Sequence, residues 1–168
     1  QAKVYRWDPL AADNALTGAE LAFGPGTRVH PDLTKASVIW SLDSDFLTLG
    51  PDHLRLARQW GATRSPKTRD ELPKMSRMYA SEGGETTTGA NADHRVRVSS
   101  GQQIDLLKAV AAQLASKHGI NLGELASAVS GATAPAEAQK FVTAVAKDLA
   151  DHKGHAIILT GERQPAAV

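Results

Sequence analysis

Hydrophobic runs alternate with amphipathic stretches along this chain, and the alternation predicts an α/β protein. Residues 37–42 (SVIWSL) and 155–159 (HAIIL) are apolar almost throughout, which is typical of strands buried in a parallel sheet. Shorter β-prone stretches at residues 2–7, 77–81 and 94–98 predict three more strands. Such alternation predicts three layers, in which a mainly parallel sheet has helices on both faces and right-handed crossovers join its strands.

Apolar residues at helical spacing predict five helices. These cover residues 11–23, 51–60, 101–114, 121–129 and 135–153. Gly61 and Gly154 are expected to end the second and the last of them. The side chains expected to face the core are Leu54, Ala57 and Trp60 in the second helix, Ile104, Leu107, Val110, Ala111 and Leu114 in the third, and Ala138, Phe141, Val142, Val145 and Leu149 in the last. Residues 63–75 are charged and lack periodicity, so they predict an exposed loop.

Composition narrows the possible functions. The 168 residues are 42% hydrophobic, enough for one domain with a substantial core. The net charge is only +1 and aromatic residues make up 5%, so no nucleic-acid partner is expected. The chain has no cysteine, which excludes disulfides, thiolate zinc sites and thiolate-bound iron–sulfur clusters within it. No run reaches the roughly 20 apolar residues that cross a bilayer, so no direct membrane insertion is expected.

Both ends of the chain have the character of cut ends. The chain opens on the strand-like AKVYRW and closes on GERQPAAV, where a helix begins just after an apolar strand. Natural domains seldom stop at such points. We therefore expect residues 1–168 to be a single α/β domain excised from a longer multidomain protein.

Three polar loops follow predicted strands, and parallel sheets bind ligands at the carboxyl ends of their strands. The loops are residues 43–45, 82–91 and 161–164. Thr86, Thr87 and Thr88 should therefore lie near Asp43 and Gly161, at what we call the carboxyl end of the sheet.

The chemistry of the first two loops is open to two interpretations. Asp43-Ser44-Asp45 is compatible with a metal or a ribose, but a polar strand end that caps nearby backbone groups is favoured. Glycines in the second loop permit close approach to phosphates. That loop has no Gly-Lys-Ser/Thr, and Glu82 and Glu85 would oppose an anion, so a plain turn is favoured there.

No catalytic constellation is visible in the sequence. The six histidines form no His-x-x-x-His pair, and no Gly-x-Ser-x-Gly nucleophile elbow occurs. We therefore predict no catalytic residue and no metal ligand.

Several stretches resemble one protein family. Residues 78–107 (MYASEGGETTTGANADHRVRVSSGQQIDLL) resemble a segment of the molybdopterin oxidoreductases. In that family an acidic strand end, a Thr-rich loop, Ala-Asp, a short strand and a Pro-Gly-Thr-Asp helix start help to hold the guanine end of the molybdenum cofactor. AKVYRWDPLAADNALTGAELAFG, VIWSLDSDFLTLGPDHLRLARQWGATR and HAIILTGERQPAAV are similar to the iron–sulfur/molybdopterin-like B subunit of alternative complex III, a relative of that superfamily.

The resemblance, which covers nearly the whole chain, implies a Rossmann-like central domain of a larger oxidoreductase subunit. It also implies a location at the periplasmic face of the bacterial inner membrane. The implied partners are other domains and subunits of a quinol-oxidising respiratory complex. Iron–sulfur clusters would lie in another domain of the parent protein, and no cofactor in this one.

Two departures from catalytic molybdopterin enzymes separate two hypotheses. Glu82-Gly83-Gly84 stands where Asp-Pro-Arg is usual, and Gln102-Gln103 where Thr-Asp is usual. Losing two charged contacts of roughly 1.5–3 kcal/mol each would weaken cofactor binding by about two to four orders of magnitude.

The first hypothesis is a cofactor-free structural and interface domain of the respiratory complex. The second is a domain that contributes to a molybdopterin guanine dinucleotide pocket in an active oxidoreductase. Its candidate contacts, vestigial under the first hypothesis, are Asp43, Ser44, Glu82, Thr88, Asp93, Gln103 and Glu162.

Overall fold

The computed structural model of the protein describes residues 2–5 and 13–166. Its strands are β1 (Val38–Leu42), β2 (Arg77–Glu82), β3 (His94–Arg97) and β4 (Ala156–Thr160). Its helices are α1 (Asp13–Phe23), α2 (His53–Thr63), α3 (Thr87–Ala90), α4 (Gln103–His118), α5 (Ala126–Val129) and α6 (Gln139–Asp151). Short 3₁₀ turns cover Leu33–Lys35, Arg69–Lys74, Ser100–Gln102, Gly123–Leu125 and Ala136–Ala138.

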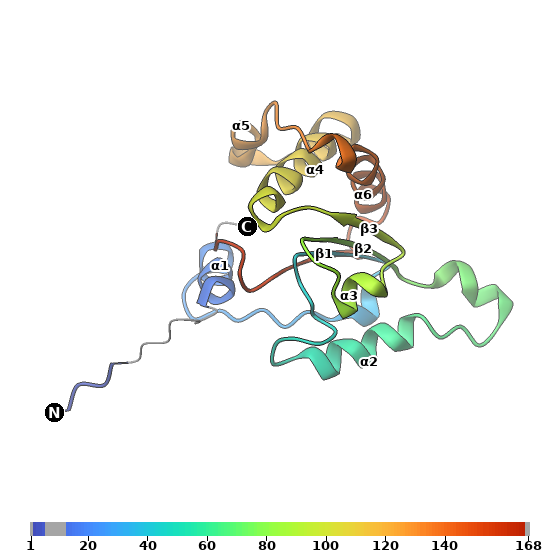
Figure 1. Ribbon diagram of the computed structural model, residues 1–168, viewed down its shortest axis with the longest axis horizontal. Coiled ribbons are helices and arrows are strands. Elements are labelled where there is room, and N and C mark those ends of the chain that lie inside the picture. The colour runs from blue at the N-terminus through green and yellow to red at the C-terminus, as the bar shows by residue number, and fades with distance from the viewer. Residues whose placement is uncertain (1, 6–12, 167–168) are drawn as a thin grey trace.

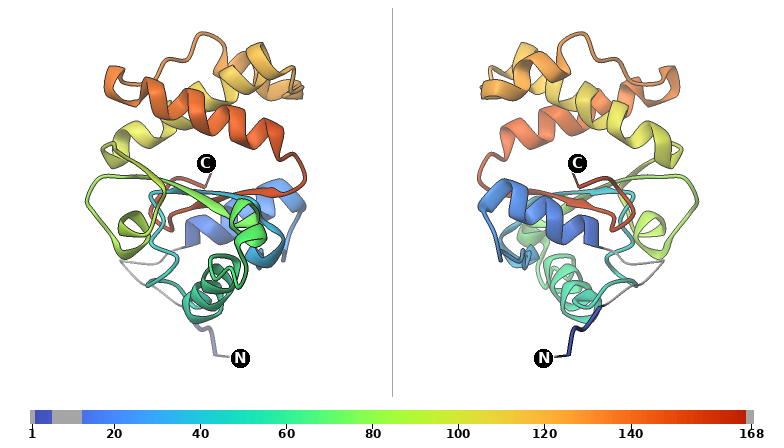
Figure 2. Two further views of the ribbon diagram at one scale, coloured as in Figure 1. Left: turned by 90° about the vertical axis from the view of Figure 1, so that its right-hand side faces the viewer. Right: turned by 90° about the vertical axis from the view of Figure 1, so that its left-hand side faces the viewer.

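The four strands form one sheet in the order β3-β2-β1-β4, and every neighbouring pair is parallel. Helix α2 lies on one face of the sheet, and α4, α5 and α6 lie on the other (Figure 1). The views of Figure 2 show the same three layers. The predicted α/β fold is therefore confirmed. The order 3-2-1-4 is that of a doubly wound sheet, in which the chain reverses direction between β1 and β4.

Alternating side chains of β1 supply a core on each face of the sheet. Trp40 packs with Tyr79, Val142 and other residues under α4 and α6. Ile39 points the other way, into a cluster with Trp60 of α2. Because the sheet is covered on both faces, β1 is fully buried, as its apolar sequence predicted.

The predicted core faces of the helices are only partly correct. All five apolar positions predicted for the last helix are buried, four of them in α6 and Ala138 in the 3₁₀ turn before it. In α2, however, Leu56 and Trp60 are buried while Leu54 is 75% exposed, and the helix continues past Gly61 to Thr63. The buried apolar residues of α4 are Leu106, Ala109 and Val110, whereas Ile104, Leu107, Ala111 and Leu114 are only partly buried. Both helices have apolar residues on more than one side, so the spacing of these residues alone could not identify the side that packs against the sheet.

Two strand predictions need correction. β4 was expected to be buried on both faces, but it is the outer strand of the sheet and Ile158 is 38% exposed. Residues 2–5 belong to no strand and are exposed, and the rest of the stretch predicted over 2–7 lies outside the described residues. Residues 63–75 are mostly exposed, as predicted, and include one 3₁₀ turn.

Candidate functional site

The predicted loops meet at the carboxyl end of the sheet. The Thr88 hydroxyl and backbone N–H both donate to Asp45 Oδ1, at 2.8 and 2.9 Å. The Thr88 hydroxyl also accepts from the Leu47 N–H at 3.1 Å. Gly161 N–H donates to the Leu42 carbonyl at 2.9 Å. The threonines lie at the carboxyl end of the sheet, as predicted, but the residue that Thr88 contacts in the first loop is Asp45, and Thr87 and Thr88 lie in the one-turn helix α3 rather than in an open loop.

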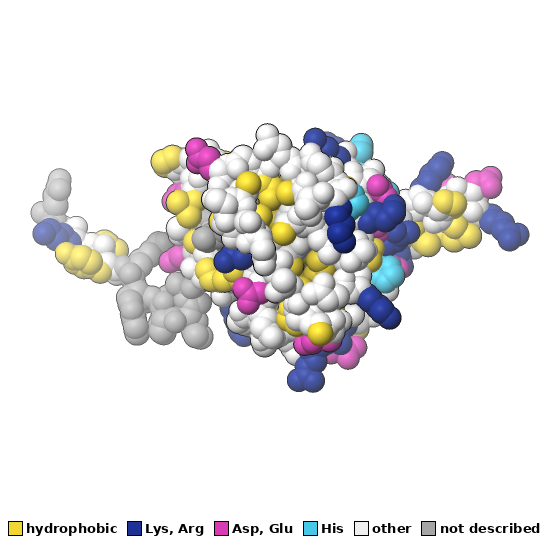
Figure 3. All heavy atoms as spheres, turned by 90° about the horizontal axis from the view of Figure 1, so that it is seen from above, with side chains coloured by type: hydrophobic (Ala, Val, Ile, Leu, Met, Phe, Trp, Pro, Cys, Tyr) yellow, Lys and Arg dark blue, Asp and Glu magenta, His cyan; other side chains and the backbone are white. Residues whose placement is uncertain are grey.

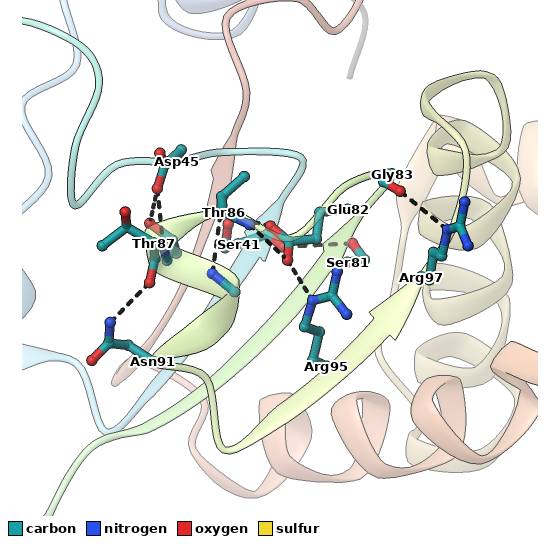
Figure 4. Close-up of polar contacts among 12 residues, drawn as sticks. Ser41, Asp45, Ser81, Glu82, Gly83, Thr86, Thr87, Asn91, Arg95 and Arg97 are labelled. Atoms are coloured by element: carbon teal, nitrogen blue, oxygen red, sulfur yellow. Dashed lines mark hydrogen bonds and ion pairs between the residues drawn. The ribbon is translucent and has the colours of Figure 1, made fainter.

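Glu82 ends β2, and its side chain lies inside the turn that the second loop makes, with only 4% of its surface exposed. Its carboxylate accepts hydrogen bonds from the Thr86 hydroxyl at 2.7 Å, the Thr86 N–H at 3.3 Å and Arg95 Nε at 2.5 Å (Figure 4). A buried carboxylate is costly unless it is paired and hydrogen-bonded, and here both requirements are met. The loop therefore wraps around a side chain of its own strand.

Gly89 lets this arrangement form. A Cβ placed on Gly89 would stand 1.7 Å from Glu82 Oε1, so only glycine leaves room for the carboxylate. Gly89 N–H also donates to the Thr86 hydroxyl at 3.1 Å, which fixes the start of α3. Thr86 and Gly89 thus shape a site that Glu82 fills.

Asp43 closes the gap between β1 and β4, the place where a doubly wound sheet usually opens a crevice. Its Oδ2 accepts from Gln164 Nε2 at 2.8 Å and from the Ser100 hydroxyl at 3.1 Å. Gln164 is only 4% exposed. A Cβ on Gly161 would stand 1.9 Å from the Asp43 carbonyl oxygen, so the two loops touch through their backbones.

The remaining candidates do not join one pocket. Ser44 takes part through its carbonyl, which accepts from Ser41 Oγ at 2.5 Å. Glu162 is exposed, and its carboxylate lies beside Gly50. Gln103 is fully buried; its Nε2 donates to the Val98 carbonyl at 3.2 Å, and its Oε1 has no hydrogen-bond partner among the described residues.

Asp93 lies away from the other candidates, just before β3 and therefore at the amino end of the sheet. Its carboxylate accepts from both terminal nitrogens of Arg64, at 2.8 and 3.1 Å, and from the Met78 N–H at 2.8 Å. The Ala-Asp step thus anchors Arg64 beside the start of β2, and Asp93 does not face the carboxyl-end loops.

A second polar cluster lies at the amino end, between β2 and α6. Asp148 Oδ2 accepts from Tyr79 Oη and from an Arg77 Nη, each at 2.6 Å. Burial raises the pKa of Asp148, but the hydrogen bonds from Tyr79 and Arg77, with the Arg77 charge, outweigh it, so this pKa lies below its ordinary value. Burial and the neighbouring Asp148 carboxylate raise the pKa of Tyr79.

Two hollows lie away from the carboxyl end. One, of about 660 Å³, lies at the amino end and includes Lys35, Ser76 and His155 in its wall. The other, of about 530 Å³, lies between α4, α5 and the residues before α6. Within residues 2–5 and 13–166, no three His, Cys, Asp or Glu side chains gather as metal ligands would. No helix in that part of the chain is both long and apolar enough to cross a membrane.

Four residues at the carboxyl end were not predicted as site residues. They are Asp45, Arg95, Ser100 and Gln164. Asp45 and Gln164 belong to loops that the sequence had singled out. Arg95 had no comparable signal, since Arg97 shares its side of β3 and instead donates to the Gly83 carbonyl at 3.3 Å.

Comparison with known proteins does not assign this chain to a family. Neither the known protein-family models nor the curated proteins contain a match to this chain. The resemblance to the alternative complex III subunit therefore stays a prediction.

Proposed function

We propose that this chain is a cofactor-free structural and interface domain of a membrane-associated, quinol-oxidising respiratory complex at the periplasmic face of a bacterial inner membrane. The parent protein in this proposal is an oxidoreductase subunit whose iron–sulfur clusters lie in another domain. The family assignment is supported by the ordered resemblance of four segments. The cofactor-free role is supported by how the carboxyl end of the sheet is built.

The observation that carries the proposal is the position of Glu82. In a nucleotide site, the Thr-rich turn and a nearby cation would offer their donors to a ligand. Here Thr86 and Arg95 give theirs to a buried carboxylate of the same chain. A phosphate or guanine that entered would have to displace Glu82 and leave its charge without a partner, which is strongly unfavourable.

Asp43 supports the same proposal at the gap between β1 and β4, where doubly wound sheets usually bind ligands. The Asp43–Gln164 hydrogen bond and the backbone contact at Gly161 close the gap between β1 and β4. The domain would then keep the architecture of a binding domain and contribute surface and rigidity to the complex.

One observation favours the alternative, a domain that contributes to a molybdopterin guanine dinucleotide pocket. Gln103 Oε1 is buried without a hydrogen-bond partner among the residues that the structure describes, and this residue stands where the family has its guanine-binding carboxylate. This oxygen could accept a hydrogen bond from a ligand. Gln103 is fully buried, however, so a ligand would reach its amide group only after the residues packed around it moved.

Titration of the purified chain with guanosine monophosphate distinguishes the two. We expect no change in melting temperature and no shifts in the backbone NMR signals of residues 82–91. Stoichiometric molybdopterin guanine dinucleotide in the purified protein, or saturable nucleotide shifts at Thr86 and Gln103, would overturn the cofactor-free role. Co-purification of the parent protein with respiratory subunits tests the interface role separately.

A further inference from the structure

The outer strand β4 leaves one side of its backbone without a partner. Val38 N–H donates to the His155 carbonyl at 3.3 Å, and Gly161 N–H donates to the Leu42 carbonyl at 2.9 Å. Backbone groups alternate sides along a strand, so the odd-numbered residues of β4 face β1. The N–H and C=O groups of Ala156, Ile158 and Thr160 therefore point outward, where no other described strand pairs with them.

The two outer strands of the sheet differ in how their free sides are protected. β3 has the sequence HRVR, and its two arginines and histidine are exposed. Such charges are a common means of preventing pairing with another chain. β4 has the sequence AIILT, with no charge, and Ile158 is 38% exposed. β4 thus has the composition of an interior strand in an outer position.

We propose that β4 pairs in antiparallel fashion with β4 of a second copy of this chain, about a twofold axis at Ile158. Ile158 would face Ile158 of the copy, and Ala156 would face Thr160. This register makes all three outward-facing residues of each strand hydrogen-bond to the copy, because they lie symmetrically about Ile158. The two sheets would then form one continuous eight-stranded sheet.

The second copy is the occupant that this surface fits. The free side of β4 is uncharged, so two copies do not repel one another there, whereas a β3–β3 pair would bring arginines together. The two Ile158 side chains would shield each other on the α6 side of the sheet. The pairing uses no residue of the carboxyl-end loops, so it stands or falls independently of the proposed function.

A cysteine placed on β4 gives a direct test, because the chain has no cysteine of its own. Directly opposed residues that share hydrogen bonds have Cα atoms about 5.5 Å apart, within the range of a disulfide. We expect oxidised Ile158→Cys to form a covalent dimer and Thr160→Cys to remain monomeric, since Thr160 would face Ala156. An equal mixture of Ala156→Cys and Thr160→Cys should form dimers again.

Sedimentation velocity completes the test without a cross-link. We expect the unmodified chain to sediment with twice its monomer mass and Ile158→Lys, whose circular dichroism should be unchanged, to sediment as a monomer. The proposal is overturned by a monomeric unmodified chain, by dimers that survive Ile158→Lys, or by equal cross-linking at positions 158 and 160.

Discussion

The two ends of the sheet differ in the space that their side chains leave. At the carboxyl end, Glu82, Asp45 and Asp43 each accept hydrogen bonds from the chain's own side chains. At the amino end lies an open hollow of about 660 Å³. Seen from the side of α4 and α6, Lys, Arg and His side chains gather toward this amino end (Figure 3). Ligand sites of parallel sheets lie at the carboxyl end, and here Glu82 and Asp43 at that end are engaged by the protein's own side chains.

Under the proposed function, a binding architecture persists without space for a ligand. The Thr-rich turn presents its donors, and the Arg95 cation lies beside them. Their acceptor is Glu82, which is 4% exposed. The carboxyl end should therefore be sensitive to changes at its internal pairs, whereas the amino end should tolerate changes at its exposed charges.

The largest effect is expected for Arg95→Leu. This change leaves the Glu82 carboxylate buried without its cation, and breaking a buried pair costs about 3–5 kcal/mol. The side chain of Arg95 is 29% exposed, so we expect a loss near the lower figure. Urea unfolding measures it. Arg97→Leu is the matched control on the same side of β3, and its free energy of unfolding should change by less than about 1 kcal/mol. Equal losses would mean that the Glu82–Arg95 pair has no special role.

Gly161→Ala should have the next largest effect. The added Cβ would stand 1.9 Å from the Asp43 backbone oxygen, and backbone cannot turn aside as a flexible side chain can. Overpacking of this kind costs about 1–3 kcal/mol. Gly101→Ala is the control, because nothing lies within 4 Å of its new Cβ. If thermal unfolding showed the same loss of stability in both variants, it would contradict close contact between the loops after β1 and β4.

Gly89→Ala tests the Glu82 site from its other side. Its Cβ would overlap the Glu82 carboxylate, which must then leave Thr86 or Arg95. We expect a loss of about 1–3 kcal/mol, below that of Gly161→Ala because a side chain moves here rather than backbone. The double variant Gly89→Ala/Glu82→Ala should lose less than the sum of the two single changes, since the overlap is gone. If urea unfolding showed that the losses of the two single variants simply add in the double variant, the result would argue against close contact between Gly89 and the Glu82 carboxylate.

The smallest effect concerns the amino end and depends on pH. The pKa of Asp148 is lowered in the folded protein. Its ionised carboxylate therefore contributes fully to the free energy of unfolding at pH values above the ordinary pKa of aspartate, and this contribution is lost as the pH falls through the pKa of the folded state. Below about pH 4, the stability difference between the unmodified chain and Asp148→Asn should therefore narrow. Asp70→Asn, at an exposed position, should show no such narrowing. A difference that stays constant down to low pH would contradict the prediction.

The sequence predicted the layers better than the details that close the site. Apolar runs and turn residues sufficed for β1, β2 and α6, because burial on both faces or along one stripe leaves a clear pattern. The burial of β4 was mispredicted, since an apolar run does not reveal whether a neighbouring strand exists. The choice of Arg95 over Arg97 as the partner of Glu82 depends on the twist and register of β2 and β3, which local sequence does not specify.

The central claim is that Glu82 occupies a site able to hold a carboxylate, and chemical rescue tests it most directly. Glu82→Ala removes the equivalent of one acetate and leaves Thr86, Gly89 and Arg95 around the space. Sodium acetate should raise the melting temperature of Glu82→Ala above its value in sodium chloride of equal ionic strength, because binding to the folded state stabilises it. The unmodified chain and Glu82→Ala/Arg95→Leu should not respond to acetate. An acetate response that is the same in all three proteins, or absent from Glu82→Ala, would contradict the account.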